Sequence, residues 1–127
     1  MTDRHHHEVL SALRQPTVSL RQARPDPWSG FTALHEAAMT DGTIPRRIKE
    51  LIAMAIGVID ECDGCIAYHA RAAARAGATP AEAAEVLGVA LLMGGGPSSV
   101  WAPRAWEAFH EFLADSVRPA PPSAATG

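Results

Sequence analysis

The chain has 127 residues, of which 47% are hydrophobic and 20% charged, the composition of one ordinary globular domain. Its 11 Lys and Arg residues against 14 Asp and Glu residues give a net charge of −3, so the sequence predicts neither nucleic-acid nor membrane-surface binding. No apolar run approaches the roughly 20 residues of a membrane-spanning helix, and the first residues lack the apolar core of a secretory signal. We therefore expect a cytoplasmic protein, in which a stable structural disulfide would be uncommon.

The N-terminal part is expected to begin with a flexible tail over residues 1–8. Three consecutive histidines at 5–7 lie in this tail, and we expect them to bind metal only adventitiously. Apolar residues between 9 and 20 then predict a short helix that is interrupted at Pro16, since proline in a helix interior removes a hydrogen bond.

Residues 25–59 are expected to form a turn followed by two helices. Prolines 25 and 27 predict an extended or turning segment, because each proline fixes φ and restricts the preceding residue. A stripe of apolar residues at three-and-four spacing predicts a helix over 28–39, which ends at a turn. Pro45 suits the first turn of the next helix, which is apolar nearly all round as far as Ile59 and is therefore expected to be the buried central helix.

The C-terminal half predicts three more helices. A helix carrying the two cysteines is expected to run from about residue 62 to Gly77. Thr79, followed by proline and by Glu82, forms the pattern of a capping box, which predicts a helix to about residue 93. Glycines 94–96 interrupt the chain before a last helix over 98–116, and residues 117–127 are expected to be a disordered tail. No stretch shows the alternation of a strand, so the fold should be all-α, without a β-sheet.

The only two cysteines, Cys62 and Cys65, are followed four residues later by His69. On a helix, residues i, i+3 and i+7 share one face, so the three side chains are expected to point the same way. Such a group could form a redox or nucleophilic site. It could also bind zinc, although the fourth ligand would have to come from His35, His110 or an acid without diagnostic spacing. The plain alternative is that two small cysteines pack in the core.

Glu50 and Tyr68 are two further candidates for a role near this group. Glu50 lies in an otherwise apolar helix and could either be solvated there or fold against the cysteine helix as a proton acceptor. Tyr68 could line the edge of the site or pack against a neighbouring subunit, and packing is the favoured interpretation.

Four motifs resemble those of the AhpD-like alkylhydroperoxidases, which belong to the carboxymuconolactone decarboxylase superfamily. They are Arg-Ile-Lys-Glu-Leu-Ile at 47–52, Cys62-x-x-Cys65-x-x-x-His69, Gly-Ala-Thr-x-x-Glu at 77–82 and Leu-Met-Gly-Gly-Gly-Pro at 92–97. The resemblance covers about residues 31–112. It implies an AhpD-like helical bundle over residues 9–116 that is built on a core helical hairpin. It also implies an obligate homo-oligomer, a homotrimer or homohexamer.

The resemblance further implies an enzyme, a thiol-dependent alkyl hydroperoxidase or disulfide reductase that needs no cofactor or metal. Cys65 would attack the peroxide, Cys62 would resolve the sulfenic acid to a Cys62–Cys65 disulfide, and Glu50 and His69 would relay protons. The substrate would be a small peroxide or disulfide, and an external thiol would supply electrons.

The chain departs from the family pattern at Gly64, where the well-studied peroxidases carry a histidine of their proton relay. Two other functions remain open. One is a lyase like the decarboxylase branch, which does not depend on a cysteine pair. The other is a non-enzymatic redox sensor or metal-binding protein.

Overall fold

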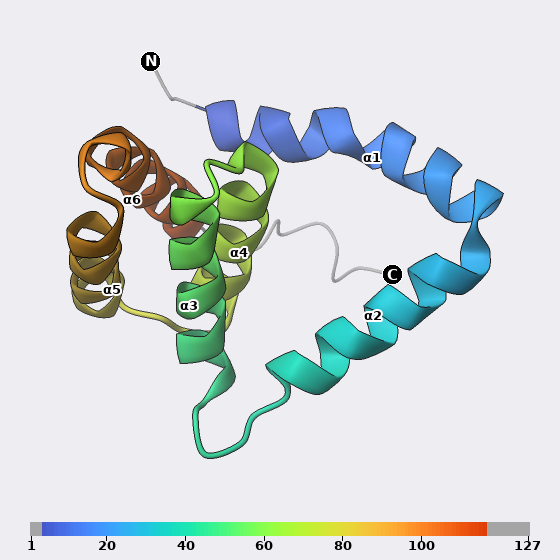
Figure 1. Ribbon diagram of the computed structural model, residues 1–127, viewed down its shortest axis with the longest axis horizontal. Coiled ribbons are helices and arrows are strands. Elements are labelled where there is room, and N and C mark those ends of the chain that lie inside the picture. The colour runs from blue at the N-terminus through green and yellow to red at the C-terminus, as the bar shows by residue number, and fades with distance from the viewer. Residues whose placement is uncertain (1–3, 117–127) are drawn as a thin grey trace, which may run out of the picture.

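The computed structural model describes residues 4–116, and this part of the chain contains six helices and no strand. The expectation of an all-α fold is therefore confirmed. The helices, in chain order, are α1 (His5–Ala23), α2 (Pro25–Met39), α3 (Arg46–Ile59), α4 (Asp63–Arg75), α5 (Pro80–Gly94) and α6 (Gly96–Ser116) (Figure 1). No helix in this part is long and apolar enough to cross a membrane.

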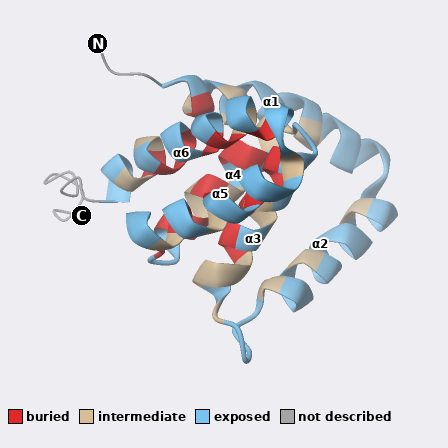
Figure 2. Ribbon diagram, turned by 60° about the vertical axis from the view of Figure 1, so that its left-hand side comes forward, coloured by how far each residue is buried: buried red, intermediate tan, exposed pale blue. Residues whose placement is uncertain are grey.

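Helices α3 and α4 form a hairpin at the centre of the molecule, with α5 and α6 packed on one side of it (Figure 1). The buried residues lie where these four helices face one another (Figure 2). The fully buried residues of α4 include the alanines at 67, 70 and 73, whose small side chains let α3 and α6 approach closely. The large buried side chains come from the neighbouring helices, among them Leu51, Met54 and Phe109.

Gly57 determines how closely α3 approaches the start of α4. A Cβ atom at this position would lie 3.3 Å from Cβ of Cys65 and from the backbone nitrogen of Ile66, closer than side chains normally pack. Glycine in α3 therefore brings the cysteine segment directly against the central helix.

Helices α1 and α2 form an open V that extends from the four-helix core (Figure 1). Helix α2 has no buried residue, and α1 has one, His6. Large apolar side chains on this V remain exposed, including Leu20, Phe31 and Leu34. The central helix α3 likewise buries one face but exposes Ile52, Ile56 and Ile59, so the expectation that it is buried all round holds for one face only.

Three expectations for the N-terminal part need correction. Residues 5–8 belong to α1 and not to a tail, because the backbone N–H groups of His6 and His7 donate hydrogen bonds to the Glu111 carboxylate of α6. Helix α1 also continues through Pro16, which lies on an exposed part of the helix. The segment with two prolines at 25 and 27 is the first turn of α2 and not an extended segment. Backbone N–H groups in the first turn of a helix have no partner within the helix, so proline costs no hydrogen bond there.

The C-terminal half follows its sequence signals closely. The capping box is present, since the Thr79 side chain accepts from the Glu82 N–H and the Glu82 carboxylate accepts from the Thr79 N–H. The break between α5 and α6 is confirmed at Gly95, whose φ of +66° is a conformation that favours glycine. The tail expected over residues 117–127 lies outside the described residues.

Candidate active site

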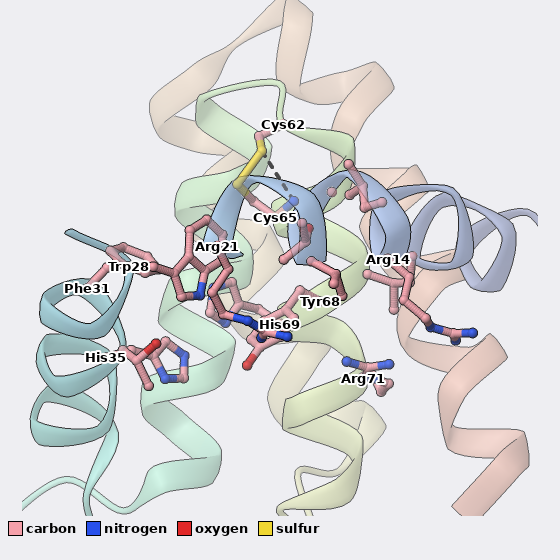
Figure 3. Close-up of a pocket in the computed structure, with 16 residues that line it drawn as sticks. Arg14, Arg21, Trp28, Phe31, His35, Cys62, Cys65, Tyr68, His69 and Arg71 are labelled. Atoms are coloured by element: carbon pink, nitrogen blue, oxygen red, sulfur yellow. Dashed lines mark hydrogen bonds between the residues drawn. A yellow bond between two sulfur atoms is a disulfide. The ribbon is translucent and has the colours of Figure 1, made fainter. Parts of the chain in front are cut away.

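Cys62 and Cys65 form a disulfide at the N-terminus of α4, with their Cα atoms 5.2 Å apart (Figure 3). Cys62 is the N-cap residue of α4, and its sulfur accepts a hydrogen bond of 3.2 Å from the backbone N–H of Cys65. Cys62 is half-buried, whereas Cys65 is exposed. The two cysteines are therefore not simply packed in the core, and Cys65 is the more exposed residue of the pair.

Glu50 and His69 form a hydrogen-bonded pair between α3 and α4. Oε1 of Glu50 lies 2.7 Å from Nδ1 of His69, and Oε2 lies 3.4 Å from Nε of Arg46. The side chain of Glu50 is fully buried, and that of His69 is 18% exposed. Of the two possibilities for Glu50, the structure selects the one in which it folds against the cysteine helix. Burial of a carboxylate in this place requires such partners, because an unpaired charge would be costly there.

His35 of α2 joins this pair from the other side. Its ring is stacked on that of His69, with the ring centroids 6.1 Å apart and the planes inclined by 24°. Its Nε2 atom is buried and has no hydrogen-bond partner. The spacing of the sequence does not place His35 beside His69, because His35 lies on a separate helix, α2, well before the cysteine segment.

A metal ion could be held here by His35 and His69, which the sequence suggested as ligands, together with Glu50 in place of the two cysteines. One ligand atom from each of His35, Glu50 and His69 lies within 4.8 Å of the other two. The cysteines are joined in a disulfide and offer no thiolate in this state. The sequence suggested His35 as the fourth ligand of a zinc site with Cys62, Cys65 and His69. In the structure, His35 lies with Glu50 and His69.

The disulfide and His69 line an open pocket of about 690 Å³ whose walls come from α1, α2 and α4 (Figure 3). Its walls combine apolar side chains, among them Trp28 and Phe31, with three guanidinium groups, and none of its described lining residues is acidic. The guanidinium groups belong to Arg14, Arg21 and Arg71. The pocket is therefore suited to an organic molecule with a negative charge.

Arg71 is partly buried and lies near other positive charges. Its pKa is lowered from the ordinary value, chiefly by burial and then by the charges of Arg75 and Arg14, while Tyr68 acts in the opposite direction. An anion bound beside Arg71 would relieve this repulsion.

Tyr68 lines the edge of the pocket, the less favoured of the two sequence-based interpretations. The residue is 40% exposed. Its ring contacts His35 and His69 edge-on, and the Arg71 guanidinium lies 5.5 Å from the ring centroid. The three arginines of the pocket were not recognised from the sequence, because Arg71 lies on a different helix from Arg14 and Arg21.

Gly64 lies between the cysteines under a side chain of α1. A Cβ atom at this position would lie 2.9 Å from Cδ1 of Leu13, so a larger residue would require Leu13 to move. Leu13 therefore takes space that a side chain at position 64 would need. The imidazole that lies next to His69 in this chain is that of His35, from α2.

The geometry combines two chemical functions. Two cysteines within disulfide distance can exchange two electrons with a substrate. The carboxylate–imidazole pair formed by Glu50 of α3 and His69 of α4 can accept or donate the proton that accompanies this exchange. Cys65 and His69, four residues apart on α4, both line the pocket, so a small substrate in it would reach both groups.

Comparison with known proteins identifies the family of this chain. Residues 25–108 match the carboxymuconolactone decarboxylase family. The chain is 40% identical over 96 residues to an uncharacterised protein of Cupriavidus necator, covering 76% of this chain and 85% of the relative. It is 35% identical over 82 residues to an uncharacterised protein encoded in the cox locus of Paracoccus denitrificans, covering 65% and 74% of the two chains.

Two solved structures share the fold. A carboxymuconolactone decarboxylase family protein of Legionella pneumophila, crystallised in its apo form, superposes with a TM-score of 0.85 at 38% identity, covering 87% of this chain and 99% of the other. A family member from Thermotoga maritima, suggested to take part in the antioxidative response, gives a TM-score of 0.73 at 25% identity over 86% and 92% of the two chains.

Proposed function

Because this chain belongs to the carboxymuconolactone decarboxylase family, we propose that it is a thiol-dependent oxidoreductase that reduces a small hydroperoxide or disulfide. The observation that carries this proposal is the position of the Cys62–Cys65 disulfide in a pocket beside the Glu50–His69 pair. A disulfide that merely stabilised the fold would need neither an exposed cysteine nor a buried acid–base pair beside it.

In the peroxidase reaction, the thiolate of Cys65 attacks the terminal oxygen of the hydroperoxide and the O–O bond breaks. Cys65 becomes a sulfenic acid, and the alkoxide takes up a proton from the His69–Glu50 pair to leave as an alcohol. The Cys62 thiol then attacks the sulfenic sulfur, which forms the disulfide and releases water. In sum, one hydroperoxide and two thiols give one alcohol, one water and one disulfide. The exposure of Cys65 supports its role as the attacking thiol.

The return to the dithiol uses an external thiol as reductant. Its thiolate attacks the sulfur of Cys65, and Cys62 leaves as a thiolate. A second thiol of the reductant then attacks the mixed disulfide, which releases the thiolate of Cys65 and the reductant as its own disulfide. The N–H of Cys65 donates to the sulfur of Cys62 at the N-terminus of α4, where negative charge is stabilised. Cys62 is thus a favourable leaving group. The same chemistry would reduce a small disulfide substrate when the dithiol form is the starting state.

The lining of the pocket favours an organic substrate with an acidic group. Trp28 and Phe31 provide apolar surface, and the guanidinium groups of Arg14 and Arg71 provide charge for a carboxylate. A hydroperoxide or disulfide that carries a carboxylate meets both requirements.

We also propose that the protein acts as a homotrimer or homohexamer in the cytoplasm. Apolar side chains gather on the surface of α5, where Leu92 is 79% and Met93 is 76% exposed. Together with the exposed face of α3 and the open V of α1 and α2, they would be covered by further copies of the chain.

The decisive experiment mixes the fully reduced protein with an alkyl hydroperoxide and follows free thiols and peroxide consumption over time. Loss of two thiols, with mass spectrometry showing a Cys62–Cys65 link, and repeated turnover with an added dithiol would support the enzyme. Loss of thiols without turnover would identify a redox sensor. A protein that leaves the thiols unchanged but decarboxylates a cyclic lactone would instead be a lyase.

A further inference from the structure

We propose that His5, His6 and Asp63 form a binding site for a divalent metal ion, best suited to Zn²⁺, where the start of α1 meets the start of α4. One ligand atom from each of the three residues lies within 4.8 Å of the other two. The site lies outside the redox pocket, and its existence does not depend on the proposed function.

The ligand atoms are held in place by the fold. Nε2 of His5 lies 3.5 Å from Oδ2 of Asp63, and the rings of His5 and His6 meet edge-on with their centroids 4.8 Å apart. The side chain of His6 is completely buried. Its Nδ1 atom has no hydrogen-bond partner, and neither has the buried Oδ1 atom of Asp63. Two buried polar atoms without partners in one cluster are costly unless something binds between them.

The outer hydrogen bonds prepare His6 for this role. Its other ring nitrogen, Nε2, lies 2.9 Å from Oε1 of Glu107 on α6. When Nε2 carries the proton that is donated to this carboxylate, Nδ1 bears the lone pair that a metal requires. A carboxylate that orients a histidine in this way is the usual outer partner of a metal-ligating imidazole.

The donor set favours zinc. Two imidazole nitrogens and one carboxylate oxygen suit a borderline ion such as Zn²⁺, whereas Mg²⁺ and Ca²⁺ prefer oxygen ligands alone. Three protein ligands leave one position of a tetrahedral site for water. Since Asp63 directly follows Cys62, the ion would join the start of the cysteine helix to α1.

The third histidine of the run supplies a matched control. His7 is adjacent in sequence but points to other partners, because Nδ1 forms a short contact with Glu111 and Nε2 lies 2.6 Å from Oδ2 of Asp115. If three consecutive histidines bound metal merely as a flexible run, replacing any of them would weaken binding equally. If the folded cluster binds the ion, replacement of His7 should have little effect.

The test is isothermal titration of Zn²⁺ into the metal-stripped full chain, kept in its disulfide form so that no thiolate can bind the ion. We expect one ion per chain and a raised melting temperature in its presence. Binding should weaken at least tenfold in Asp63→Asn and in His6→Gln, by about 10- to 100-fold in Glu107→Gln, and hardly at all in His7→Gln. Asp63→Asn and His5→Gln change partly exposed side chains, so they test the site even if His6→Gln fails to fold.

Three results would overturn the proposal. The first is an absence of Zn²⁺ binding to the folded chain. The second is equal weakening by His7→Gln and Asp63→Asn, which would identify an adventitious histidine run. The third is binding that survives Asp63→Asn and is lost in His35→Gln, which would place the ion at the cluster of His35, Glu50 and His69.

Discussion

The carboxylate of Glu50 and the imidazole of His69, 19 residues apart in sequence, are joined by a 2.7 Å hydrogen bond from Nδ1 of His69 to Oε1 of Glu50. The carboxylate is fully buried, so this bond is shielded from the solvent that weakens contacts at the surface. It fixes the orientation of the imidazole in the pocket that contains Cys65.

Replacement of Glu50 by Gln should slow turnover without unfolding the protein. Gln keeps the shape of the side chain but cannot accept a proton, and positioned acid–base groups contribute roughly 10²- to 10⁴-fold to rate. The measurement is the pH–rate profile for hydroperoxide or disulfide reduction, with circular dichroism to check the fold. The exposed Glu36→Gln on α2 is the control and should leave the profile unchanged. An insoluble or monomeric Glu50→Gln would show that Glu50 is structural.

The two cysteines should give different products when replaced singly. Cys65→Ser should abolish peroxide consumption, since it removes the attacking thiol. Cys62→Ser should consume one equivalent of peroxide and stop at a sulfenic acid on Cys65, which a dimedone probe can trap and mass spectrometry can locate. A sulfenic acid trapped on Cys62 in Cys65→Ser, together with an inert Cys62→Ser, would reverse the two roles.

Arg71 should determine the preference for charged substrates. Loss of a charge-assisted hydrogen bond of about 1.5–3 kcal/mol corresponds to a rise of roughly 10- to 100-fold in KM. Arg71→Gln should therefore raise KM for a hydroperoxide with a carboxylate while leaving a neutral alkyl hydroperoxide unaffected. Arg75→Gln is the matched control, because Arg75 is close to Arg71 but does not line this pocket. Equal effects on both substrates would mean that Arg71 shapes the pocket and does not select charge.

Glu82 should make the stability of the fold depend on pH in the acidic range. Its pKa is lowered chiefly by the hydrogen bond from the Thr79 N–H and further by the Arg47 guanidinium. A lowered folded-state pKa means that the contribution to stability is present above the unfolded-state pKa of roughly 4.3 and is lost as pH falls through the folded value. Urea unfolding should show wild type more stable than Glu82→Gln at pH 7, with a difference that shrinks in acid. The exposed Glu85→Gln should show no such trend, and a pH-independent difference for Glu82→Gln would contradict this cause.

Local signals in the sequence predicted the helices well. The capping box at Thr79 and Glu82, the cysteine spacing and the glycine break before α6 each depend on residues close in the chain, so each can be interpreted without the fold. Pro16 is an exception, because a proline on an exposed part of a helix can be tolerated where the rest of the helix is held. The contacts of His6 and His7 with α6 hold the start of α1, and no local pattern reveals them.

The candidate site was predictable only in part for the same reason. Cys62, Cys65 and His69 come from one segment, and Glu50 was recognised because an acid interrupts an apolar helix. His35 and the arginines of the pocket come from α1, α2 and α4, and only the folded arrangement of these three helices around one pocket brings them together. The environment of Gly64 was equally inaccessible to sequence reasoning, since it is made by Leu13 of α1, 51 positions earlier.

Position 64 is glycine in this chain, whereas the related peroxidases have a histidine there. Whether Leu13 prevents a histidine at this position can be tested by substitution. The backbone at Gly64 does not have positive φ, so Leu13 is the obstacle to a side chain there. As a single substitution, Gly64→His should lower the free energy of unfolding. In the Leu13→Ala background the same substitution should cost less, and a double-mutant cycle of urea unfolding should give a coupling energy of about 0.5–3 kcal/mol. An added imidazole beside both sulfurs gives protons a second route, so the double variant should reduce hydroperoxide faster than Leu13→Ala does. Equal rates in these two variants would mean that His35 and His69 already suffice for proton transfer, and additive stabilities would mean that Leu13 does not limit position 64.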